Sequence, residues 1–227
     1  MQKIIQFINF VILWLKRKRK IKLFNGPVKV NVGSGFTVAP NWINIDGNFN
    51  LLFKNFPIFI LKLIYKYTGI KKWMDLEHFI KTLKSNKFIH HNVLYGLPFH
   101  NETVDFVYSS HLLEHLFKED AFQLLKEIYR VLKKGGLFRL CIPDMDYVLN
   151  LYQNGKKQEA LKYLFPESKA DYFSRHRYMY DFETISEILK EVGFKEITKQ
   201  EYRQGSLPDV EKLDNRPFES LHLEAKK

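Results

Sequence analysis

Three side chains that can bind a metal or move a proton lie close together in the segment YSSHLLEHLF, residues 108–117: His111, Glu114 and His115. Their spacing, H-x-x-E-H, is one of the patterns that hold zinc in metallopeptidases. Such a site needs a helix, which places both histidines on one face, and a third ligand from elsewhere in the chain. The acidic residues available for this in a later helical stretch are Glu183, Glu187 and Glu191. A zinc metallopeptidase is therefore one hypothesis for this chain.

The residues around this motif favour a different interpretation. The preceding VDFVY, residues 104–108, is a short apolar run typical of a buried strand. The leucines in and after the motif suit a turn that packs against a sheet: Leu112, Leu113 and Leu116. We therefore expect no metal ligands here. Glu114 and His115 are interpreted as a buried hydrogen-bonded pair, and His111, at the strand end, as either a structural residue or a contact of the site.

Apolar patterns and glycine stops predict seven strands and the helices between them. The strands are expected at residues 28–35, 41–47, 87–93, 103–110, 137–143, 194–202 and 219–225. The helices are expected within residues 51–67, where Pro57 suits a helix start, at 75–83 and 121–132, within 144–164, and at 182–194. The glycines of KKGG, residues 133–136, are expected to cap the helix before them. Strands that alternate with helices predict an α/β fold of the Rossmann-like kind, with a mainly parallel sheet covered on both faces.

In such a sheet, ligands bind beyond the carboxyl ends of the strands. Gly33 and Gly35 remove side chains there, where the chain turns and a ligand can touch the backbone. Asp46 ends the second strand, and its carboxylate can accept hydrogen bonds from both hydroxyls of a ribose. Asn92 ends the third strand and can pair with an adenine edge. The residues that end the fourth strand would line the floor near the reactive end of the ligand: Ser109, Ser110 and His111.

A dinucleotide-binding fold is the nearest alternative for this end of the sheet. It requires G-x-G-x-x-G and an acid about 20 residues later. This chain has Val38 at the third glycine position, and Asp46 follows Gly35 by only 11 residues. That spacing leaves little room for a long first helix, whose N-terminus would bind a pyrophosphate. A ligand that carries an adenosine but no pyrophosphate, such as S-adenosylmethionine, fits the spacing better.

Four segments carry a family resemblance: VNVGSG, WINIDG, LPFHNETVDFVYSSHLLEHL and EIYRVLKKGGLFRLCIPD. Together they resemble the class I S-adenosylmethionine-dependent methyltransferases, and especially the small bacterial branch linked with cell-surface glycan biosynthesis. The later segments HRYMYDFETISEILKEVGF and DNRPFESLHLEAKK also resemble that branch, so the resemblance covers residues 28–227. The resemblance implies a seven-stranded sheet with an antiparallel last strand, and S-adenosylmethionine as the cofactor. The cofactor contacts that we expect from the pattern and the resemblance are Asn31, Gly33, Ser34, Gly35, Asp46, Asn92, Val93, Ser109 and His111.

Two of these positions depart from the family pattern. Asn31 and Asn92 stand where the family commonly has acids. The amide oxygens can still accept hydrogen bonds, but the negative charge is absent, so weaker cofactor binding is expected. A scaffold protein that binds S-adenosylmethionine and has lost catalysis is therefore a second hypothesis.

Methyl transfer requires an acceptor held in line with the methyl group, and a base if the acceptor is an alcohol. Three residues are candidates for that catalytic base: His111, Asp144 and His176. Asp144 follows the fifth strand, where its alternative role is a helix N-cap. His176 lies between Arg175 and Arg177, and this basic segment suits either a solvated loop or a clamp for an anionic substrate.

The charge of the chain favours anionic partners. The formal net charge is +11 and the isoelectric point is about 9.5. Nucleic acid is nevertheless not expected, because the fourth strand ends in YSSH and not in the Asn/Asp-Pro-Pro-aromatic turn associated with methylation of base amino groups. The single cysteine, Cys141, excludes a disulfide framework.

The N-terminal segment has the opposite residue order to a signal peptide. An apolar run at residues 4–15 precedes the basic cluster KRKRK at residues 16–20. The run is shorter than the ~18 apolar residues of a membrane span. It predicts an amphipathic basic helix that either lies on an acidic membrane surface or packs against its own domain or a partner chain.

We therefore expect two parts, an N-terminal amphipathic basic helix at residues 1–27 and an S-adenosylmethionine-binding domain at residues 28–227. The expected activity is that of an S-adenosylmethionine-dependent methyltransferase (EC 2.1.1.-) whose acceptor is a small molecule or a glycan, which a lipid can carry. The expected location is the cytoplasm, with peripheral contact at the inner face of the membrane.

Overall fold

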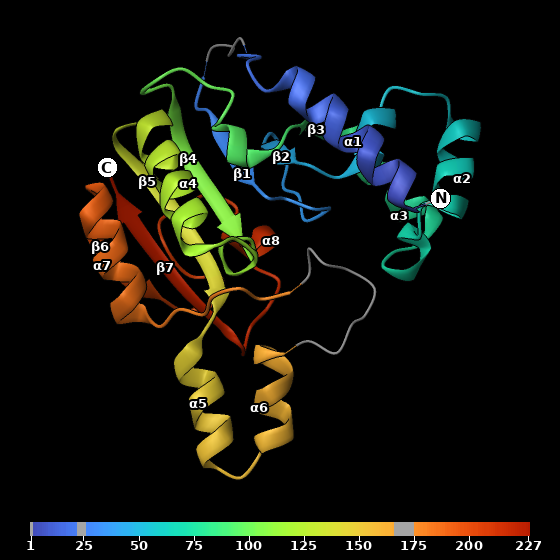
Figure 1. The fold of residues 1–227 in the computed structure, drawn as a ribbon. Helices are drawn as coiled ribbons and strands as arrows, with labels where there is room; N and C mark the ends of the chain where they lie inside the picture. Colours follow the sequence, from blue (N-terminus) through green and yellow to red (C-terminus); the bar gives the residue numbers. More distant parts are fainter. Residues whose placement is uncertain (1, 22–25, 166–174) are drawn as a thin grey trace.

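A computed structural model describes residues 2–21, 26–165 and 175–227. Its centre is a seven-stranded sheet of order β3-β2-β1-β4-β5-β7-β6 (Figure 1). The strands are β1 (Lys29–Val32), β2 (Ile43–Asp46), β3 (Lys87–His90), β4 (Val104–Ser110), β5 (Leu132–Pro143), β6 (Lys195–Gln200) and β7 (Ser220–Lys226). β7 pairs antiparallel with both β5 and β6, whereas the pairs among β1 to β5 are parallel. The predicted fold class is confirmed.

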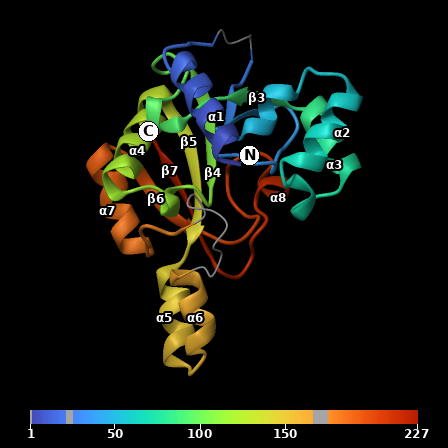
Figure 2. The same ribbon diagram turned by 45° about the vertical axis from the view of Figure 1, so that its right-hand side comes forward.

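Helices connect the strands and surround the sheet. The α-helices are α1 (Gln2–Lys16), α2 (Ile58–Tyr67), α3 (Leu76–Ser85), α4 (Lys118–Val131), α5 (Met145–Gln153), α6 (Lys157–Leu164), α7 (Phe182–Val192) and α8 (Val210–Leu213). The 3-10 helices are η1 (Phe49–Phe53), η2 (Ile70–Lys72), η3 (Val93–Tyr95) and η4 (Leu113–His115). Figure 2 shows α5 and α6 as a hairpin that extends from the body of the molecule beyond the end of β5.

Alternate residues of the central strands serve the two faces of the sheet. In β4, Val107 packs into the large apolar cluster that includes Leu125 of α4 and Leu189 of α7. The next residue, Tyr108, packs on the opposite face with Leu213 of α8. Burial on both faces fixes the register of the strands, because a shift of one residue would exchange the two sets of side chains.

One predicted helix start is confirmed and one predicted helix end is wrong. In the stretch 51–67, α2 starts directly after Pro57, as that proline predicts, and η1 precedes it as a separate 3-10 helix. The glycine cap expected after α4 is not formed, since the helix ends at Val131 and residues 133–136 already belong to β5. The glycines serve the strand instead, because a Cβ on Gly136 would lie 2.8 Å from a backbone carbonyl oxygen.

The N-terminal helix α1 is shorter than the predicted segment 1–27, of which residues 22–25 lie outside the described chain. The side that carries Asn9 and Leu13 faces the protein. Asn9 Nδ2 donates to the Gly47 carbonyl at 2.9 Å, and Asn9 Oδ1 accepts from His90 Nε2 at 2.8 Å. Leu13 is buried against the same region. Within the described residues, no helix is long and apolar enough to cross a bilayer. The division at residue 27 stays a prediction.

A buried ion cluster on β5 was not predicted from the sequence. Arg139 is completely buried in the middle of the strand. Its guanidinium donates to both carboxylate oxygens of Asp214, at 3.1 and 2.5 Å, and to Glu224 Oε1 at 3.2 Å. Two backbone carbonyls, of Glu201 and Gln204, accept its remaining N–H groups at 3.1 and 2.7 Å. The cluster therefore fastens the loop between β6 and β7 to the centre of the sheet.

Candidate functional site

The turn after β1 lies at the point where the strand order reverses, between β1 and β4. The N–H groups of Gly33 and Ser34 both donate to the Ile45 carbonyl, at 2.9 and 3.1 Å, which bends the chain sharply across the end of β2. Gly33 has φ +70°, and a Cβ there would lie 2.6 Å from the side chain of Leu112. Gly35 has φ +51°, and open space surrounds the place where its Cβ would be. Both glycines are therefore required by backbone conformation, and Gly35 leaves its backbone open to a ligand.

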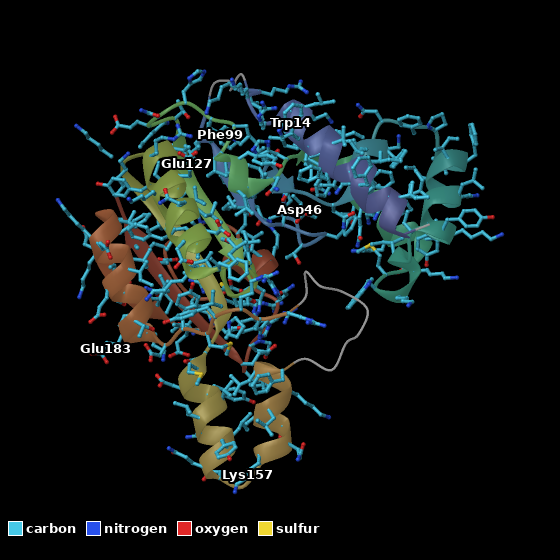
Figure 3. All side chains as sticks on the ribbon, in the orientation of Figure 1. Trp14, Asp46, Phe99, Glu127, Lys157 and Glu183 are labelled. Carbon is cyan, nitrogen blue, oxygen red and sulfur yellow. The ribbon has the colours of Figure 1, made fainter. Side chains whose placement is uncertain are left out.

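Asp46 lies beside this turn, as the sequence predicts. Its Oδ2 accepts from the Gly35 N–H at 2.8 Å, and its Oδ1 accepts from the Asn48 N–H at 2.8 Å. Burial raises the pKa of the Asp46 carboxyl above its ordinary value, although the two backbone N–H groups lower it. Each oxygen keeps a lone pair, so the half-buried carboxylate can accept two more hydrogen bonds. Figure 3 shows Asp46 below α1, near the centre of the molecule.

Asn92 and Val93 follow β3 near Asp46, since the His91 N–H donates to the Asp46 carbonyl at 3.0 Å. Asn92 caps η3, and its Oδ1 accepts from the Leu94 N–H at 3.0 Å. The half-buried Asn92 amide keeps its NH₂ group for another partner, and Val93 is buried at the first position of η3. A contact of these two residues with an adenine stays a prediction.

Three further predicted contacts have their side chains turned into the protein. Asn31 is buried in β1 and donates to the Thr37 carbonyl at 2.9 Å, which holds the loop after the glycine turn. Ser109 is fully buried, and its hydroxyl donates to the Val32 carbonyl at 3.1 Å. Ser34 is buried within the turn itself. These side chains support the turn from behind, and their direct contact with a ligand stays a prediction.

The motif HLLEH forms a short 3-10 turn after β4, and not an α-helix. The three acids considered as a distal zinc ligand are all exposed on α7: Glu183, Glu187 and Glu191. Figure 3 shows Glu183 on the outer side of the molecule. Among the described residues, no group of metal-binding atoms joins both histidines of the motif to one of these acids. The geometry of the metallopeptidase hypothesis is therefore absent from the part of the chain that is described.

His111 connects the end of β4 to two neighbours. It has φ +50°, and its N–H donates to the Cys141 carbonyl at 2.9 Å. Its Nε2 lies 2.9 Å from Ser220 Oγ, and its Nδ1 lies 3.2 Å from Glu114 Oε1. The sequence gives no sign of Ser220 as a partner. Because both ring nitrogens have polar neighbours, the orientation of the His111 ring is fixed. Its positive φ is a strained backbone conformation, and His111 lies at a strand end of the kind where ligands bind in α/β sheets.

Asp144 and His176, the other two predicted bases, differ in position. Asp144 is the N-cap of α5 and accepts from the Asp146 N–H at 3.0 Å, so the alternative role of a helix cap is observed. Burial raises the pKa of Asp144 above its ordinary value. His176 is half-buried and lies against the motif, with its ring centroid 5.2 Å from that of His115. The structure thus brings His176, and not Asp144, into contact with the HLLEH segment.

Residues 58–140 match the family model of a methyltransferase domain. The matched domain contains β3, β4, α4 and most of β5, and with them the HLLEH turn. This part of the chain is therefore similar to a methyltransferase domain.

The chain is also similar to two individual proteins. An uncharacterized protein of Methanocaldococcus jannaschii is 32% identical over 118 residues, which is 52% of this chain; the chain spans only half the length of that relative. The crystal structure of a SAM-dependent methyltransferase from Archaeoglobus fulgidus superposes with a TM-score of 0.50 over 98% of this chain and 94% of that one. Its sequence identity is 18%, so this likeness shows the fold. The chain therefore shares its fold with that protein.

Proposed function

We propose that the protein is an S-adenosylmethionine-dependent methyltransferase (EC 2.1.1.-) that methylates a small-molecule or glycan acceptor. One observation carries the proposal: the Asp46 carboxylate faces the Gly33–Gly35 turn at the switch in strand order, with one free lone pair on each oxygen. A vicinal diol of a ribose is the ligand group that such a carboxylate matches. Gly35 leaves the adjacent backbone uncovered, which fits the amino-acid end of the cofactor.

S-adenosylmethionine supplies an activated methyl group on a sulfonium, so the protein has mainly to position and to shield. Asp46 would hold the ribose, and the glycine turn would pass beside the amino-acid end. His111 lies at the end of β4, two strands from Asp46, where the acceptor would approach. Positioning of this kind supplies much of the rate of a transfer reaction. His111 and His176 are the candidates to receive a proton from an alcohol acceptor.

Titration calorimetry with S-adenosylmethionine and with S-adenosylhomocysteine tests the proposal. We expect saturable binding of both compounds with one site per chain. If neither binds at millimolar concentration, the proposal is wrong. Binding followed by a complete lack of methyl transfer across a broad screen of glycans and small molecules would favour the scaffold hypothesis, which rests on Asn31 and Asn92 at positions where acids are common.

We further propose that the enzyme works at the inner face of the membrane on a lipid-linked acceptor. Because Asn9 and Leu13 face the domain, the opposite side of α1 faces outward. The exposed apolar residues recur along the helix: Ile4, Phe7, Phe10, Trp14 and Leu15. Phe7 and Leu15 are 67% and 66% exposed. α2 adds a second exposed set, Ile58, Phe59, Leu63 and Tyr67. Apolar surface of this extent supports docking on lipid.

A basic pocket beside α1 supports an acidic lipid surface as the occupant. The pocket, of about 400 Å³, lies between the end of α1, η1 and the edge strand β3. Lys16, Arg19 and Lys54 line it, and none of the described lining residues is acidic. Burial lowers the pKa of Lys54, and the nearby Arg19 and Lys16 charges lower it further. A lipid phosphate would relieve the repulsion among these cations while the exposed apolar residues enter the bilayer.

The docking proposal predicts a selective loss of membrane binding. Changing Phe7 and Leu15 together to serine is expected to reduce flotation with vesicles of acidic phospholipid at least tenfold, because each buried apolar side chain contributes about 1.5–3 kcal/mol. The matched control changes Leu149 and Tyr152, which are exposed on α5, to serine. That control should float like the unchanged protein. Equal losses in both variants, or no binding of the unchanged protein to acidic vesicles, would reject α1 as the docking element.

A further inference from the structure

We propose that Glu114, His115 and His176 bind one divalent transition-metal ion at the carboxyl end of β4. This revises the expectation from the sequence that the HLLEH segment holds no metal. One potential ligand atom from each residue lies within 4.8 Å of the other two. Two ligands at about 2.1 Å from one zinc ion are at most about 4.2 Å apart, so binding requires only small side-chain movements.

Two segments distant in sequence are fastened together to form the cluster. The Glu114 carbonyl accepts from the Arg177 N–H at 2.7 Å. The Arg177 side chain in turn donates from Nε to the His115 carbonyl at 2.9 Å. The neighbouring His176 thereby comes to the η4 turn, so the backbone holds the three side chains near one another without any help from an ion.

Both histidines are oriented as metal ligands commonly are. His115 Nδ1 lies 3.3 Å from the Arg175 carbonyl, and His176 Nδ1 lies 2.7 Å from the Tyr163 carbonyl. A carbonyl oxygen can only accept, so each Nδ1 carries the hydrogen and each Nε2 keeps its lone pair. A hydrogen bond of this kind from the far nitrogen fixes the ring and its tautomer in most metal-bound histidines. Consistent with this, His115 Nε2 is the atom that faces Glu114 Oε1, at 3.8 Å.

Glu114 gives a second and independent indication of a cation-binding site. Glu114 is 0% exposed, and neither of its carboxylate oxygens has a hydrogen-bond partner of good geometry. His111 Nδ1 lies 3.2 Å from Oε1, which places a positive or polar group beside the carboxylate but leaves Oε2 unpartnered. A buried carboxylate without full compensation is costly. A bound cation would compensate it, with His111 as the residue that positions Glu114.

The ligand set indicates the class of metal. Two imidazole nitrogens and one carboxylate suit zinc, cobalt, manganese or iron in the divalent state, and not calcium or magnesium, which prefer oxygen ligands. Three protein ligands leave at least one position for an exogenous oxygen. The site also differs from the metallopeptidase pattern, because Glu114 acts here as a ligand and His111 does not.

A role for this metal follows if the proposed methyltransferase function is correct, and this step rests on that function. The open position would take the hydroxyl oxygen of an alcohol acceptor, and the metal would lower the pKa of that hydroxyl so that its proton passes to water. With the metal bound, His176 would serve as a ligand and not as the base. The oxygen then forms a bond to the methyl carbon. The bond from carbon to the sulfonium sulfur breaks, and its electron pair stays on sulfur as the thioether. The acceptor class would therefore be an alcohol.

The experiment uses the full chain without S-adenosylmethionine, so its result does not depend on cofactor binding. Metal is removed with a chelator and the protein is titrated with Zn²⁺, followed by elemental analysis, and separately with Co²⁺, followed by visible spectroscopy. We expect one ion per chain, a d–d absorption of nitrogen and oxygen ligation, and a higher unfolding temperature. Less than 0.2 ion per chain at tenfold excess would overturn the site, and so would a sulfur-to-cobalt charge-transfer band, which would place the ion at Cys141.

Matched variants locate the ion. Glu114→Gln and His176→Gln should each weaken Co²⁺ binding at least 100-fold, while the exposed His100→Ala should leave it unchanged. His176→Gln is the safer test of folding, since that side chain is only half-buried, and circular dichroism of the metal-free variants checks it. Unchanged Co²⁺ affinity in a folded His176→Gln variant would reject the site. Loss of Co²⁺ binding with normal S-adenosylmethionine binding separates this proposal from the function proposed above.

Discussion

Replacing Asp46 with alanine is expected to raise the dissociation constant for S-adenosylmethionine at least 100-fold. A hydrogen bond to a charged acceptor contributes about 1.5–3 kcal/mol, and a ribose offers two donors to this carboxylate. The substitution also removes the acceptor for the Gly35 and Asn48 N–H groups, which shape the turn around the ligand. Titration calorimetry of the purified variant measures the change directly.

Two companion variants make the result specific. Asp46→Asn keeps the shape of the side chain but removes the charge. It also places an NH₂ group against the N–H of Gly35 or of Asn48, so this variant should also bind S-adenosylmethionine poorly. Asp75 is an exposed aspartate that caps α3. Asp75→Ala removes the helix cap, which lowers stability slightly, and should leave cofactor affinity unchanged. An Asp46→Ala protein that is folded and binds within threefold of the unchanged protein would refute the assignment of the ribose site.

Replacing Arg139 with methionine is expected to lower the free energy of unfolding by about 3–5 kcal/mol, the usual cost of removing one partner from a buried ion pair. The substitution fills similar volume but leaves the carboxylates of Asp214 and Glu224 with less compensation in a fully buried place. Asp214 accepts two hydrogen bonds from the Arg139 guanidinium. Burial raises the pKa of Asp214, but these bonds and the positive charge of Arg139 outweigh burial, so the pKa lies below its ordinary value. Urea denaturation followed by circular dichroism measures the loss.

A surface ion pair between Lys133 of the same strand and Asp105 is the control for the Arg139 substitution. Lys133 Nζ lies 2.8 Å from Asp105 Oδ1, and the lysine side chain is 43% exposed. Lys133→Met should lower the free energy of unfolding by less than about 1 kcal/mol, because exposed pairs contribute little. If Arg139→Met costs no more than Lys133→Met, the buried cluster does not hold the loop between β6 and β7 in the way described.

The strands and the ligand end of the sheet could be predicted from the sequence because their determinants are local. Short apolar runs stopped by glycine or a polar residue mark β1, β2 and β4 within a few residues. The same local reasoning places Asp46 beside the glycine turn, because neighbouring parallel strands end at one edge. Local capping residues likewise indicate Asp144 as the start of a helix.

Features built from distant segments could not be predicted. Arg139 reads as a polar residue in an apolar strand, and its partners Asp214 and Glu224 follow 75 and 85 residues later. The approach of His176 to Glu114 depends on hydrogen bonds from the backbone N–H and the side-chain Nε of Arg177, which no spacing reveals. The direction in which α1 faces was also undetermined, because an amphipathic pattern does not say which side meets the protein. Asn9 decides it through bonds to Gly47 and His90.

Those two bonds of Asn9 reach the chain on either side of the proposed ribose contact: Gly47 directly follows Asp46, and His90 is the residue paired with Asp46 across the sheet. A displacement of α1 by lipid would therefore be transmitted to the loop that is proposed to bind the ribose. Coupling between two ligands is reciprocal, since each changes the affinity of the other by the same factor. If membrane binding raises the affinity for S-adenosylmethionine, the protein that carries S-adenosylmethionine binds the membrane more tightly by the same factor. Protein that has lost its methyl donor would then dissociate from the membrane more readily.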